Sequence, residues 1–247
     1  MNEVEPPSIR DIDFQAGSTL LIDKPQGWTS FDVVNKVRHR LRKLTGIKRI
    51  KVGHAGTLDP LATGLLILCT GKFTKKLAEF QGWDKEYTGT FHLGGTTPSY
   101  DAETEVDQTF PTDHIDADQL AEARQSFLGT IQQVPPMFSA IKVNGQPLYK
   151  KARKGETVEI KARTVHIREF ELTDIQMPNV SFRLHCSKGT YVRSLAHDMG
   201  KALNSGAYLT ALRRTQVGPH RIEQAWNLDE LIEALEDRIA EKDRMVL

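Results

Sequence analysis

One carboxylate, Asp59, stands in a twelve-residue stretch at residues 53–64 that also holds three glycines, one proline and one histidine. Glycine adopts backbone angles that are closed to other residues and lets a ligand approach the main chain closely. Pro60 disfavours helical angles at Asp59, which predicts an extended or turn conformation there. A carboxylate presented on such a loop can serve as a nucleophile. The stretch is therefore the first candidate for an active site.

The same residues also allow a purely structural interpretation. Asp before Pro is a common helix start, with Asp as the N-cap and Pro at the first helical position, and spacing alone favours this interpretation. A phosphate-binding P-loop is excluded because the Gly-x4-Gly-Lys-Ser/Thr order is missing. A metal site is not indicated, because neither a cysteine nor a second histidine stands here at ligand spacing. A helix cap and a catalytic carboxylate both stay open.

Apolar runs and turn residues predict the elements that position this loop. Residues 65–69 form a continuous apolar run of strand length, and residues 19–23 read as a second strand. Pro25 and Gly27 then mark a turn. Thr29 and Ser30 cap a predicted helix whose apolar side chains recur at helical spacing: Phe31, Val33, Val34, Val37, Leu41 and Leu44.

The rest of the chain alternates between strands and helices. Asp116 caps one predicted helix, Thr190 or Gly189 caps another, and Asn144-Gly145 predicts a turn. The predicted strands are residues 85–94, 163–175, 179–187 and 209–217, and the predicted helices are residues 72–81, 116–128, 190–203 and 228–245.

Charge is distributed unevenly along a chain whose formal net charge is only +1. Residues 34–54 hold eight Lys or Arg and no acid, residues 138–163 hold seven against two acids, and residues 101–122 hold eight acids without Lys or Arg. The two basic segments suit contact with phosphates, and Tyr149 among the lysines suits contact with exposed bases. Solvated helix faces would show the same runs, so an RNA-binding surface and ordinary surface charge both stay open.

Composition is that of an ordinary globular protein, with 247 residues of which 39% are hydrophobic and 26% charged. This length suits one large domain or two small ones. Cys69 and Cys186 lie in apolar runs, which predicts buried free thiols in a reducing compartment. The first residues lack a secretory signal, and no apolar run reaches the roughly 18 residues of a membrane span. We expect a cytoplasmic protein.

The loop around Asp59 resembles a known catalytic loop. The sequence GHAGTLDPLATG at residues 53–64, followed by TGKFTK at residues 70–75, is similar to the catalytic loop of tRNA pseudouridine synthases of the TruB type. In that family the aspartate of this loop is the catalytic nucleophile, and Asp59 matches it. The resemblance implies an isomerase.

Further stretches resemble the same family in the same order, and together they run through most of residues 19–218. The resemblance implies an α+β protein with the pseudouridine synthase fold, a mixed, mostly antiparallel sheet flanked by helices, with an RNA-binding thumb insertion at about residues 134–163. It predicts a lead-in over residues 1–18 and one catalytic domain over residues 19–247. The additional stretches are residues 24–30, 85–87, 134–155, 186–193 and 209–218.

The resemblance also implies a set of site residues. His54 matches the histidine that occupies the space vacated by the flipped nucleotide, and Tyr87 matches the tyrosine that stacks on the target uracil. Arg193 matches the arginine that pairs with the catalytic aspartate, and Tyr191 and Leu212 match residues that line the base pocket. The helix dipole disfavours a lone arginine in a first turn, so unless its side chain is simply exposed, Arg193 needs an anion beside it.

Two features depart from the family pattern. Residues 96–101, TTPSYD, lack the expected Thr-Asp-Thr run, which leaves the contacts of this segment open. The chain also ends about thirty residues after the core motifs, so we expect the small C-terminal PUA-type RNA-binding domain of many relatives to be absent or reduced to one helix. That expectation counts against the guide-RNA branch of the family.

The implied reaction converts the T-loop uridine of tRNA, at position 55, to pseudouridine. The glycosidic N–C bond breaks, uracil turns, and a C–C bond forms at the same sugar carbon; nucleophilic addition and a glycal route both fit. Asp59 must be ionised, and a neighbouring arginine opposes the rise in its pKa that burial causes. The target base must leave its stack. The resemblance implies no cofactor, no metal and no protein partner, and a monomer that reads the T-arm is expected.

Two other classes of function compete with a pseudouridine synthase as interpretations of this sequence. A tRNA-binding module or folding chaperone would explain the basic segments, but it leaves Asp59, Tyr87 and Arg193 without a role. A small-molecule glycoside hydrolase normally uses a pair of carboxylates, and only Asp59 stands in a motif. A pseudouridine synthase is the favoured interpretation.

Overall fold

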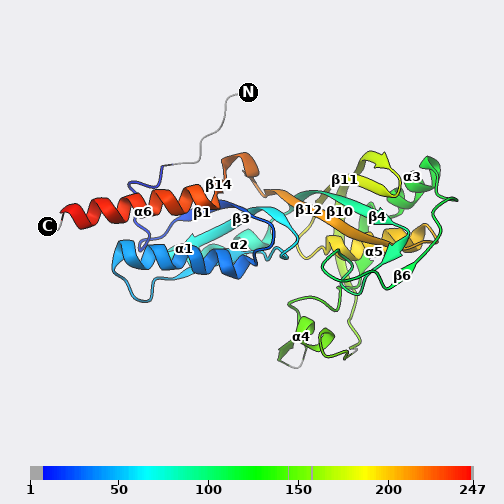
Figure 1. Cartoon of the computed structure of the whole chain (residues 1–247), viewed down its shortest axis with the longest axis horizontal. Coiled ribbons are helices and arrows are strands. Elements are labelled where there is room, and N and C mark those ends of the chain that lie inside the picture. The colour runs from blue at the N-terminus through cyan, green and yellow to red at the C-terminus, as the bar shows by residue number, and fades with distance from the viewer. Residues whose placement is uncertain (1–7, 144, 157, 246–247) are drawn as a thin grey trace. The chain divides into compact units, whose positions relative to one another are not determined.

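The computed structural model describes residues 8–143, 145–156 and 158–245 (Figure 1). Part of the predicted lead-in over residues 1–18, and Asn144 of the predicted turn, therefore lie outside the described residues. The chain divides into two compact units. Unit 1 comprises Met1–Lys85 and Arg213–Leu247, and unit 2 comprises Glu86–Leu212.

Unit 1 is built on a mixed sheet. Its strands follow the order β14-β1-β3-β12, with β2 beside β3 and β13 beside β12. Strands β1 and β2 run antiparallel to β3, whereas β14 is parallel to β1 and β12 is parallel to β3. The strands span β1 Thr19–Lys24, β2 Val52–Ala55, β3 Thr63–Thr70, β12 Ala207–Val217, β13 His220–Arg221 and β14 Trp226–Asn227.

Strand β3 is buried on both faces of this sheet. Leu66 and Leu68 belong to a first core, which they share with side chains of β1, α1 and α6. Leu65, Ile67 and Cys69 belong to a second core on the other face. A strand that is covered on both sides shows a continuous apolar run instead of alternation, and this confirms the strand predicted at residues 65–69.

Helix α1 (Ser30–Thr45) begins at the predicted cap. The Thr29 side chain accepts a hydrogen bond from the Asp32 amide while the Asp32 carboxylate accepts one from the Thr29 amide, which is a capping box. The predicted inward position of Phe31 is wrong, because its side chain is 60% exposed. Phe31 follows Ser30, which is buried, and is therefore rotated by about 100° from the buried stripe.

Two further helical segments complete unit 1. The helix predicted over residues 72–81 is a 3-10 helix, η1 (Gly71–Lys76), followed by α2 (Leu77–Gly82), and its apolar side packs on the second core. Thr70 supplies no side-chain cap, and 3-10 turns are frequent where α-helices start. A one-turn 3-10 helix, η2 (Ile222–Gln224), precedes β14. Helix α6 (Leu228–Met245) has the predicted bounds and packs beside α1 (Figure 1).

Unit 2 is built on strands in the order β12-β4-β11-β10-β7. Strand β10 is antiparallel to both β11 and β7. Phe91 and Phe182 stack at 4.2 Å in its core, and Phe170 meets Phe182 edge-on. The strands span β4 Lys85–Leu93, β7 Gly129–Gln133, β10 Arg163–Gln176 and β11 Asn179–Cys186; two small ribbons pair β5 Gly95–Thr96 with β6 Gln108–Thr109, and β8 Lys142–Val143 with β9 Gln146–Pro147.

The helices of unit 2 are α3 (Ala117–Ser126), α4 (Leu148–Ala152) and α5 (Val192–Ala202). Asp116 caps α3 as predicted. The predicted cap of α5 is wrong: its N-cap residue is Tyr191, without a side-chain hydrogen bond. The Thr190 hydroxyl donates to the Ser187 carbonyl at 2.9 Å, so it is engaged in the preceding turn and does not serve the helix.

Each unit holds one of the two cysteines, and both thiols are free and buried as predicted, Cys69 in unit 1 and Cys186 in unit 2. Burial raises the pKa of the Cys69 thiol to about 11. Among the described residues, no helix is both long enough and apolar enough to cross a membrane.

Candidate active site

Asp59 lies between β2 and β3 in a loop without helical structure. Its side chain is half-buried, and the Ala62 amide donates to the Asp59 carbonyl at 3.1 Å, which closes a turn just before β3 begins at Thr63. The structure describes every residue of this loop, and none of them starts a helix. The helix-cap interpretation of Asp59 is therefore excluded.

The turn at residues 24–30 fixes the backbone on both sides of Asp59. The Ser30 hydroxyl accepts a hydrogen bond from the Leu58 amide at 2.8 Å and donates to the Leu58 carbonyl at 3.1 Å. The Gly27 amide donates to the Pro60 carbonyl at 2.8 Å. These bonds hold the two neighbours of Asp59, so the carboxylate has a defined position before any substrate binds.

Arg214, at 1% exposure, braces both ends of the same loop. Its Nη2 donates to the Gly56 carbonyl at 3.1 Å, and its Nε donates to the Leu65 carbonyl at 2.7 Å. Gly64 pairs with Arg214 at a φ of 100°, and a Cβ added there would lie 2.3 Å from the Arg214 carbonyl oxygen. The close approach of β12 to β3 therefore requires glycine at this position.

His54 stands on β2, half-buried, at the start of this loop. Burial lowers the pKa of its imidazole below the ordinary value, and the positive charge of Arg214 lowers the pKa further, against the effect of a hydrogen bond with the Gly56 backbone. His54 is therefore neutral at pH 7. An uncharged ring suits a residue that packs beside a base better than one that binds a phosphate.

Arg193 lies in the first turn of α5 and is 5% exposed. Its Nη1 donates to the Ser99 carbonyl at 2.9 Å, its Nη2 donates to the Phe138 carbonyl at 2.7 Å, and its Nε faces Asp101 Oδ2 at 3.4 Å. Asp101 therefore supplies negative charge of the kind predicted beside the start of α5. The pairing of Arg193 with Asp59 stays a prediction.

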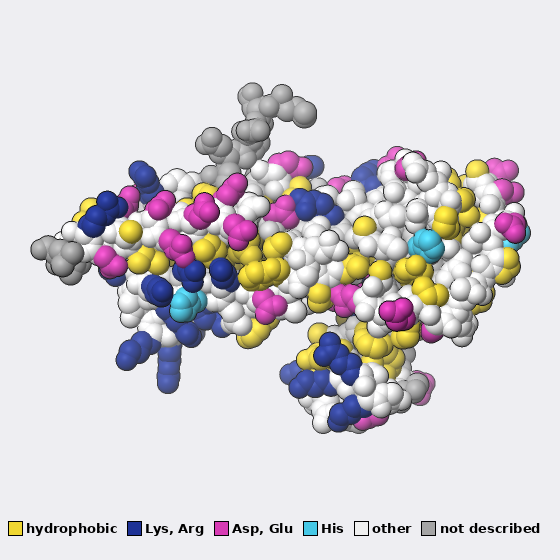
Figure 2. Space-filling view, viewed as in Figure 1, with side chains coloured by type: hydrophobic (Ala, Val, Ile, Leu, Met, Phe, Trp, Pro, Cys, Tyr) yellow, Lys and Arg dark blue, Asp and Glu magenta, His cyan; other side chains and the backbone are white. Residues whose placement is uncertain are grey.

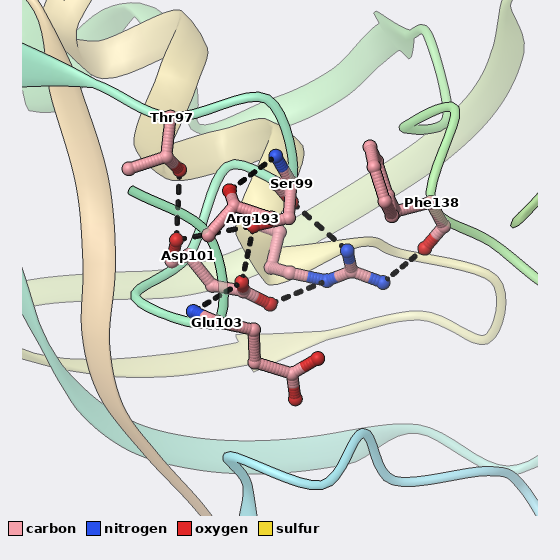
Figure 3. Close-up of polar contacts among 7 residues, drawn as sticks. Thr97, Ser99, Asp101, Glu103, Phe138 and Arg193 are labelled. Carbon is pink, nitrogen blue, oxygen red and sulfur yellow. Dashed lines mark hydrogen bonds and ion pairs between the residues drawn. The ribbon is translucent and has the colours of Figure 1, made fainter. Parts of the chain in front are cut away.

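Asp101 is a buried carboxylate, at 1% exposure, in the segment that departs from the family pattern. Its Oδ1 accepts hydrogen bonds from the Ser99 hydroxyl at 2.6 Å and the Glu103 amide at 3.0 Å, and its carbonyl accepts one from Thr97 Oγ1 at 2.7 Å (Figure 3). The 3.4 Å separation from Arg193 Nε is that of an ion pair without an ideal hydrogen bond. A buried charge is tolerated only when it is paired and bonded in this way.

The remaining predicted site residues of unit 2, Tyr87, Tyr191 and Leu212, are held by contacts with neighbouring side chains or by burial. Gln133, which is fully buried, accepts from the Tyr191 amide at 2.7 Å and donates to the Tyr191 carbonyl at 3.1 Å. The Arg163 guanidinium lies 5.5 Å from the centre of the Tyr191 ring. Tyr87 on β4 and Leu212 on β12 are 8% and 9% exposed. Asp59 and His54 belong to unit 1, and the other four predicted residues belong to unit 2.

Lys and Arg side chains gather over α1 and over the segment that holds α4 (Figure 2). A groove of about 440 Å³ runs beside α1 in unit 1, and several of its lining residues are cationic. In unit 2 the exposed cations around α4 are Lys142, Lys150, Arg153 and Lys154. The groove is lined by Arg38, Arg42, Arg49, Ile50, Lys51, Val52, Gly53, Thr74 and Leu77.

Sequence reasoning missed two residues that shape these surroundings. Arg214 was predicted only as part of a strand, although neighbouring residues of a strand face opposite sides, so one of Arg213 and Arg214 had to face inward. Asp101 was predicted only within an acidic loop, and nothing in its spacing distinguished it from the surrounding acids. Its neighbour Ser99 supplied the only local signal, since a short hydroxyl side chain two residues away can bond a carboxylate.

Two known families together match residues 42–247 of the chain. The family described as "TruB family pseudouridylate synthase (N terminal domain)" matches residues 42–192, and the family described as "tRNA pseudouridylate synthase B C-terminal domain" matches residues 193–247. The tRNA pseudouridine synthase B of Flavobacterium johnsoniae is 56% identical over 225 residues, which cover 91% of this chain and 98% of that protein. The tRNA pseudouridine synthase B of Phocaeicola vulgatus is 53% identical over 231 residues, covering 94% and 98%.

Solved structures show the same similarity at the level of the fold. A chain of a Cbf5–Nop10–Gar1 complex aligns with a TM-score of 0.67 and 30% identity over 89% of this chain and 54% of that one. A chain of the archaeal box H/ACA sRNP Nop10–Cbf5 complex aligns with a TM-score of 0.64 and 27% identity over 90% and 55%. This chain therefore spans about half the length of those two chains. The alignments confirm the expected fold, a mixed sheet flanked by helices.

Proposed function

We propose that this chain, which belongs to the TruB family of pseudouridylate synthases, converts the T-loop uridine at position 55 of tRNA to pseudouridine. Family membership makes the chain an enzyme and an isomerase. The tRNA substrate is supported by relatives named tRNA pseudouridine synthase B, which are more than half identical to it over nearly their whole length. Position 55, the T-arm and a catalytic aspartate come from the resemblance of the motifs.

The observation that carries the proposal is the construction of the Asp59 loop. Hydrogen bonds from Ser30 and Gly27 hold the residues on either side of Asp59, and Arg214 holds both ends of the loop. A nucleophile that is held in place before the substrate arrives lowers the entropic cost of reaching the transition state. Asp59 attacks the sugar carbon or the base, or assists a glycal route. In each case the bond between uracil N1 and the sugar carbon breaks, and a bond between uracil C5 and the same carbon forms.

The other predicted residues take roles that suit their surroundings. Tyr87 stacks on the uracil after the base has flipped out, and Tyr191 and Leu212 line its pocket. His54, a neutral ring, occupies the space that the flipped nucleotide leaves. Arg193 supports the ionised form of the catalytic aspartate, because a neighbouring cation favours a carboxylate over its protonated form.

Binding of the RNA is electrostatic in large part. The basic surfaces around α1 and α4 suit the phosphate backbone of a T-arm, and single-stranded loops are where RNA sequence is readable. The reaction is a rearrangement without net oxidation or hydrolysis, so its balance calls for no cofactor. We infer a monomeric enzyme that acts on tRNA in the cytoplasm.

The test is Asp59→Asn, measured by mapping pseudouridine in unmodified tRNA. Asparagine keeps the size of the side chain but removes the charge and the nucleophile, so product should fall to background. Affinity for tRNA should stay within about tenfold, roughly 1.4 kcal/mol, because the basic surfaces are intact.

Asp116→Asn is the matched control. It makes the same chemical change at the N-cap of α3, where asparagine caps nearly as well, and it should keep wild-type turnover. Wild-type product from Asp59→Asn would remove Asp59 from the chemistry. Absence of pseudouridine at position 55 with the wild-type chain would refute this uridine as the substrate.

A further inference from the structure

Tyr100 adopts a backbone conformation that its side chain disfavours. Its φ is +65°, in the left-handed region, where residues with a Cβ are less stable than glycine. The Tyr100 amide donates to the Thr97 carbonyl at 3.1 Å, and the Tyr100 carbonyl accepts from the Leu209 amide at 3.0 Å. Such a conformation persists only where the surrounding contacts over-determine it. The Tyr100 side chain must therefore make a contact that offsets the cost.

That contact is with His197 on α5. The two rings stack at a centroid distance of 3.9 Å with only 9° between their planes, and both side chains are half-buried. His197 stands four residues after Arg193, so the two side chains share one face of the helix. Aromatic pairs of this kind stabilise beyond the area that they bury.

The loop that carries Tyr100 meets the same helix face at a second point. Asp101 Oδ2 faces Arg193 Nε at 3.4 Å, and the Ser99 carbonyl accepts a hydrogen bond from Arg193 at 2.9 Å (Figure 3). An attachment at one point leaves a loop able to rotate about it. Attachments one helical turn apart fix both its position and its orientation on α5.

We propose that Tyr100 and His197 are positioning residues, whose stack holds the loop of residues 97–103 on α5 and so fixes Asp101 against Arg193. The effect on turnover rests on the proposed function, in which Arg193 serves the catalytic aspartate. The attachment itself rests on the contacts within unit 2. It also gives a role to Tyr100 in the TTPSYD segment, which lacks the family's Thr-Asp-Thr run.

The charge state of His197 suits this role. Burial and the nearby Lys201 lower the pKa of His197 to about 4, against the opposing effect of Asp107. The imidazole is neutral at pH 7 and stacks on a neutral phenol. A charged imidazolium one turn from Arg193 would compete with it for the Asp101 carboxylate, and a neutral ring does not.

The test compares His197→Ala with His197→Phe by single-turnover kinetics on unmodified tRNA. Loss of the ring should lower the rate constant about tenfold, less than the roughly hundredfold cost of a 1 Å misplacement, while the tRNA Kd stays within about twofold. Phenylalanine keeps a stacking ring and should restore the rate. His92→Ala is the matched control, since His92 also contacts a tyrosine, Tyr208, at a centroid distance of 5.2 Å, and it should keep the wild-type rate.

Two results would overturn the proposal. One is a wild-type rate constant in folded His197→Ala. The other is an undiminished further loss when His197→Ala is added to Asp101→Asn, because residues that act through the same contact are not additive. Tyr100→Gly removes the ring and relieves the backbone, and it provides the same test if His197→Ala does not fold.

A stability measurement separates failure of this inference from failure of the proposed function. If the wild-type chain forms no pseudouridine, urea unfolding still decides whether the two rings are coupled. If the double variant loses less free energy of unfolding than the sum of the losses of Tyr100→Gly and His197→Ala, the stack is supported as the attachment. If the two losses add, the proposal is overturned.

Discussion

Each unit of the molecule holds one buried arginine against a loop that carries a carboxylate, but the two arginines are bonded differently. Arg214 in unit 1 donates to backbone carbonyls at the two ends of the Asp59 loop. Arg193 in unit 2 donates to backbone carbonyls as well, and it also faces the buried carboxylate of Asp101.

Arg214 therefore holds a loop in place through its backbone, whereas Arg193 also compensates a buried negative charge. Carbonyl oxygens satisfy the N–H groups of a guanidinium without cancelling its charge, so Arg214 still acts electrostatically on its surroundings. Burial is the main cause of the lowered pKa of His54, and the charge of Arg214 lowers that pKa further. At Arg193 the Asp101 carboxylate faces the guanidinium directly. Substitutions at the two arginines should therefore differ in kind as well as in size.

The largest effect is expected for Arg193→Met. The change leaves the Asp101 carboxylate buried without its cation, which should lower the free energy of unfolding by about 3–5 kcal/mol and abolish turnover. Urea unfolding and pseudouridine mapping measure the two effects. In the double variant with Asp101→Leu, which removes both charges, stability should return in part, because the Ser99 and Phe138 carbonyls still lack their donor, while turnover does not return. Recovery of turnover would show that the charge of Arg193 has no part in the chemistry.

A smaller loss is expected for Arg214→Met. As in Arg193→Met, two carbonyls lose their donor, at about 1–3 kcal/mol for each buried group left unsatisfied, but here no buried carboxylate loses its cation. Removal of the cation should also raise the pKa of His54, although burial keeps it below the ordinary value. Titration of the His54 ring by NMR checks the shift. An unchanged pKa would mean that the charge of Arg214 does not reach the loop.

The basic surfaces of the two units can be compared by how strongly tRNA binding depends on the salt concentration. Replacing Lys150, Arg153 and Lys154 by alanine should weaken tRNA binding and reduce the slope of log Kd against log salt by about 0.7–0.9 for each phosphate that the variant no longer neutralises. The same measurement with Arg42, Lys43 and Lys48, three exposed cations at the end of α1 and just after it, tells which surface binds more of the RNA backbone. An unchanged slope for either set would remove that surface from the RNA interface.

The smallest effect concerns pH. Three histidines have a lowered pKa, His54 and His220 in unit 1 and His197 in unit 2, and the value for His197 is about 4. The folded protein binds fewer protons than the unfolded chain at these sites, so their contribution to stability is present above about pH 6.5 and is lost as the pH falls toward 4. His197→Phe should flatten the decline in urea midpoint between pH 7 and 5. An equally steep decline would place the titrating group elsewhere.

The sequence predicted regular elements well, because periodicity reports which side of an element is buried. The run at residues 65–69 and the C-terminal helix were predicted with nearly their observed bounds. Phe31 was misplaced because one residue's rotation moves a helical side chain off the buried stripe. The helix predicted over residues 72–81 starts within one residue of its expected position, but its first part is a 3-10 helix, which the apolar spacing there does not distinguish from an α-helix.

The site was only partly predictable for a different reason. Asp59 followed by Pro60 fits both a cap and a loop, and only the absence of a helix in the fully described loop decided between them. Arg193 was expected to need an anion, but local sequence does not say which of many acids supplies it. Asp101, ninety-two residues earlier in the chain, reaches it through tertiary folding alone.

The single buried cysteine in each unit gives the wild-type chain its own reporters of local opening. Only a thiolate reacts with an alkylating reagent, and a buried thiol such as Cys69, whose pKa is about 11, must be exposed before it can react. Labelling at Cys69 therefore follows the opening of unit 1, and labelling at Cys186 follows that of unit 2. Mass spectrometry of the two tryptic peptides would rank the units by how often each opens, with no engineered probe.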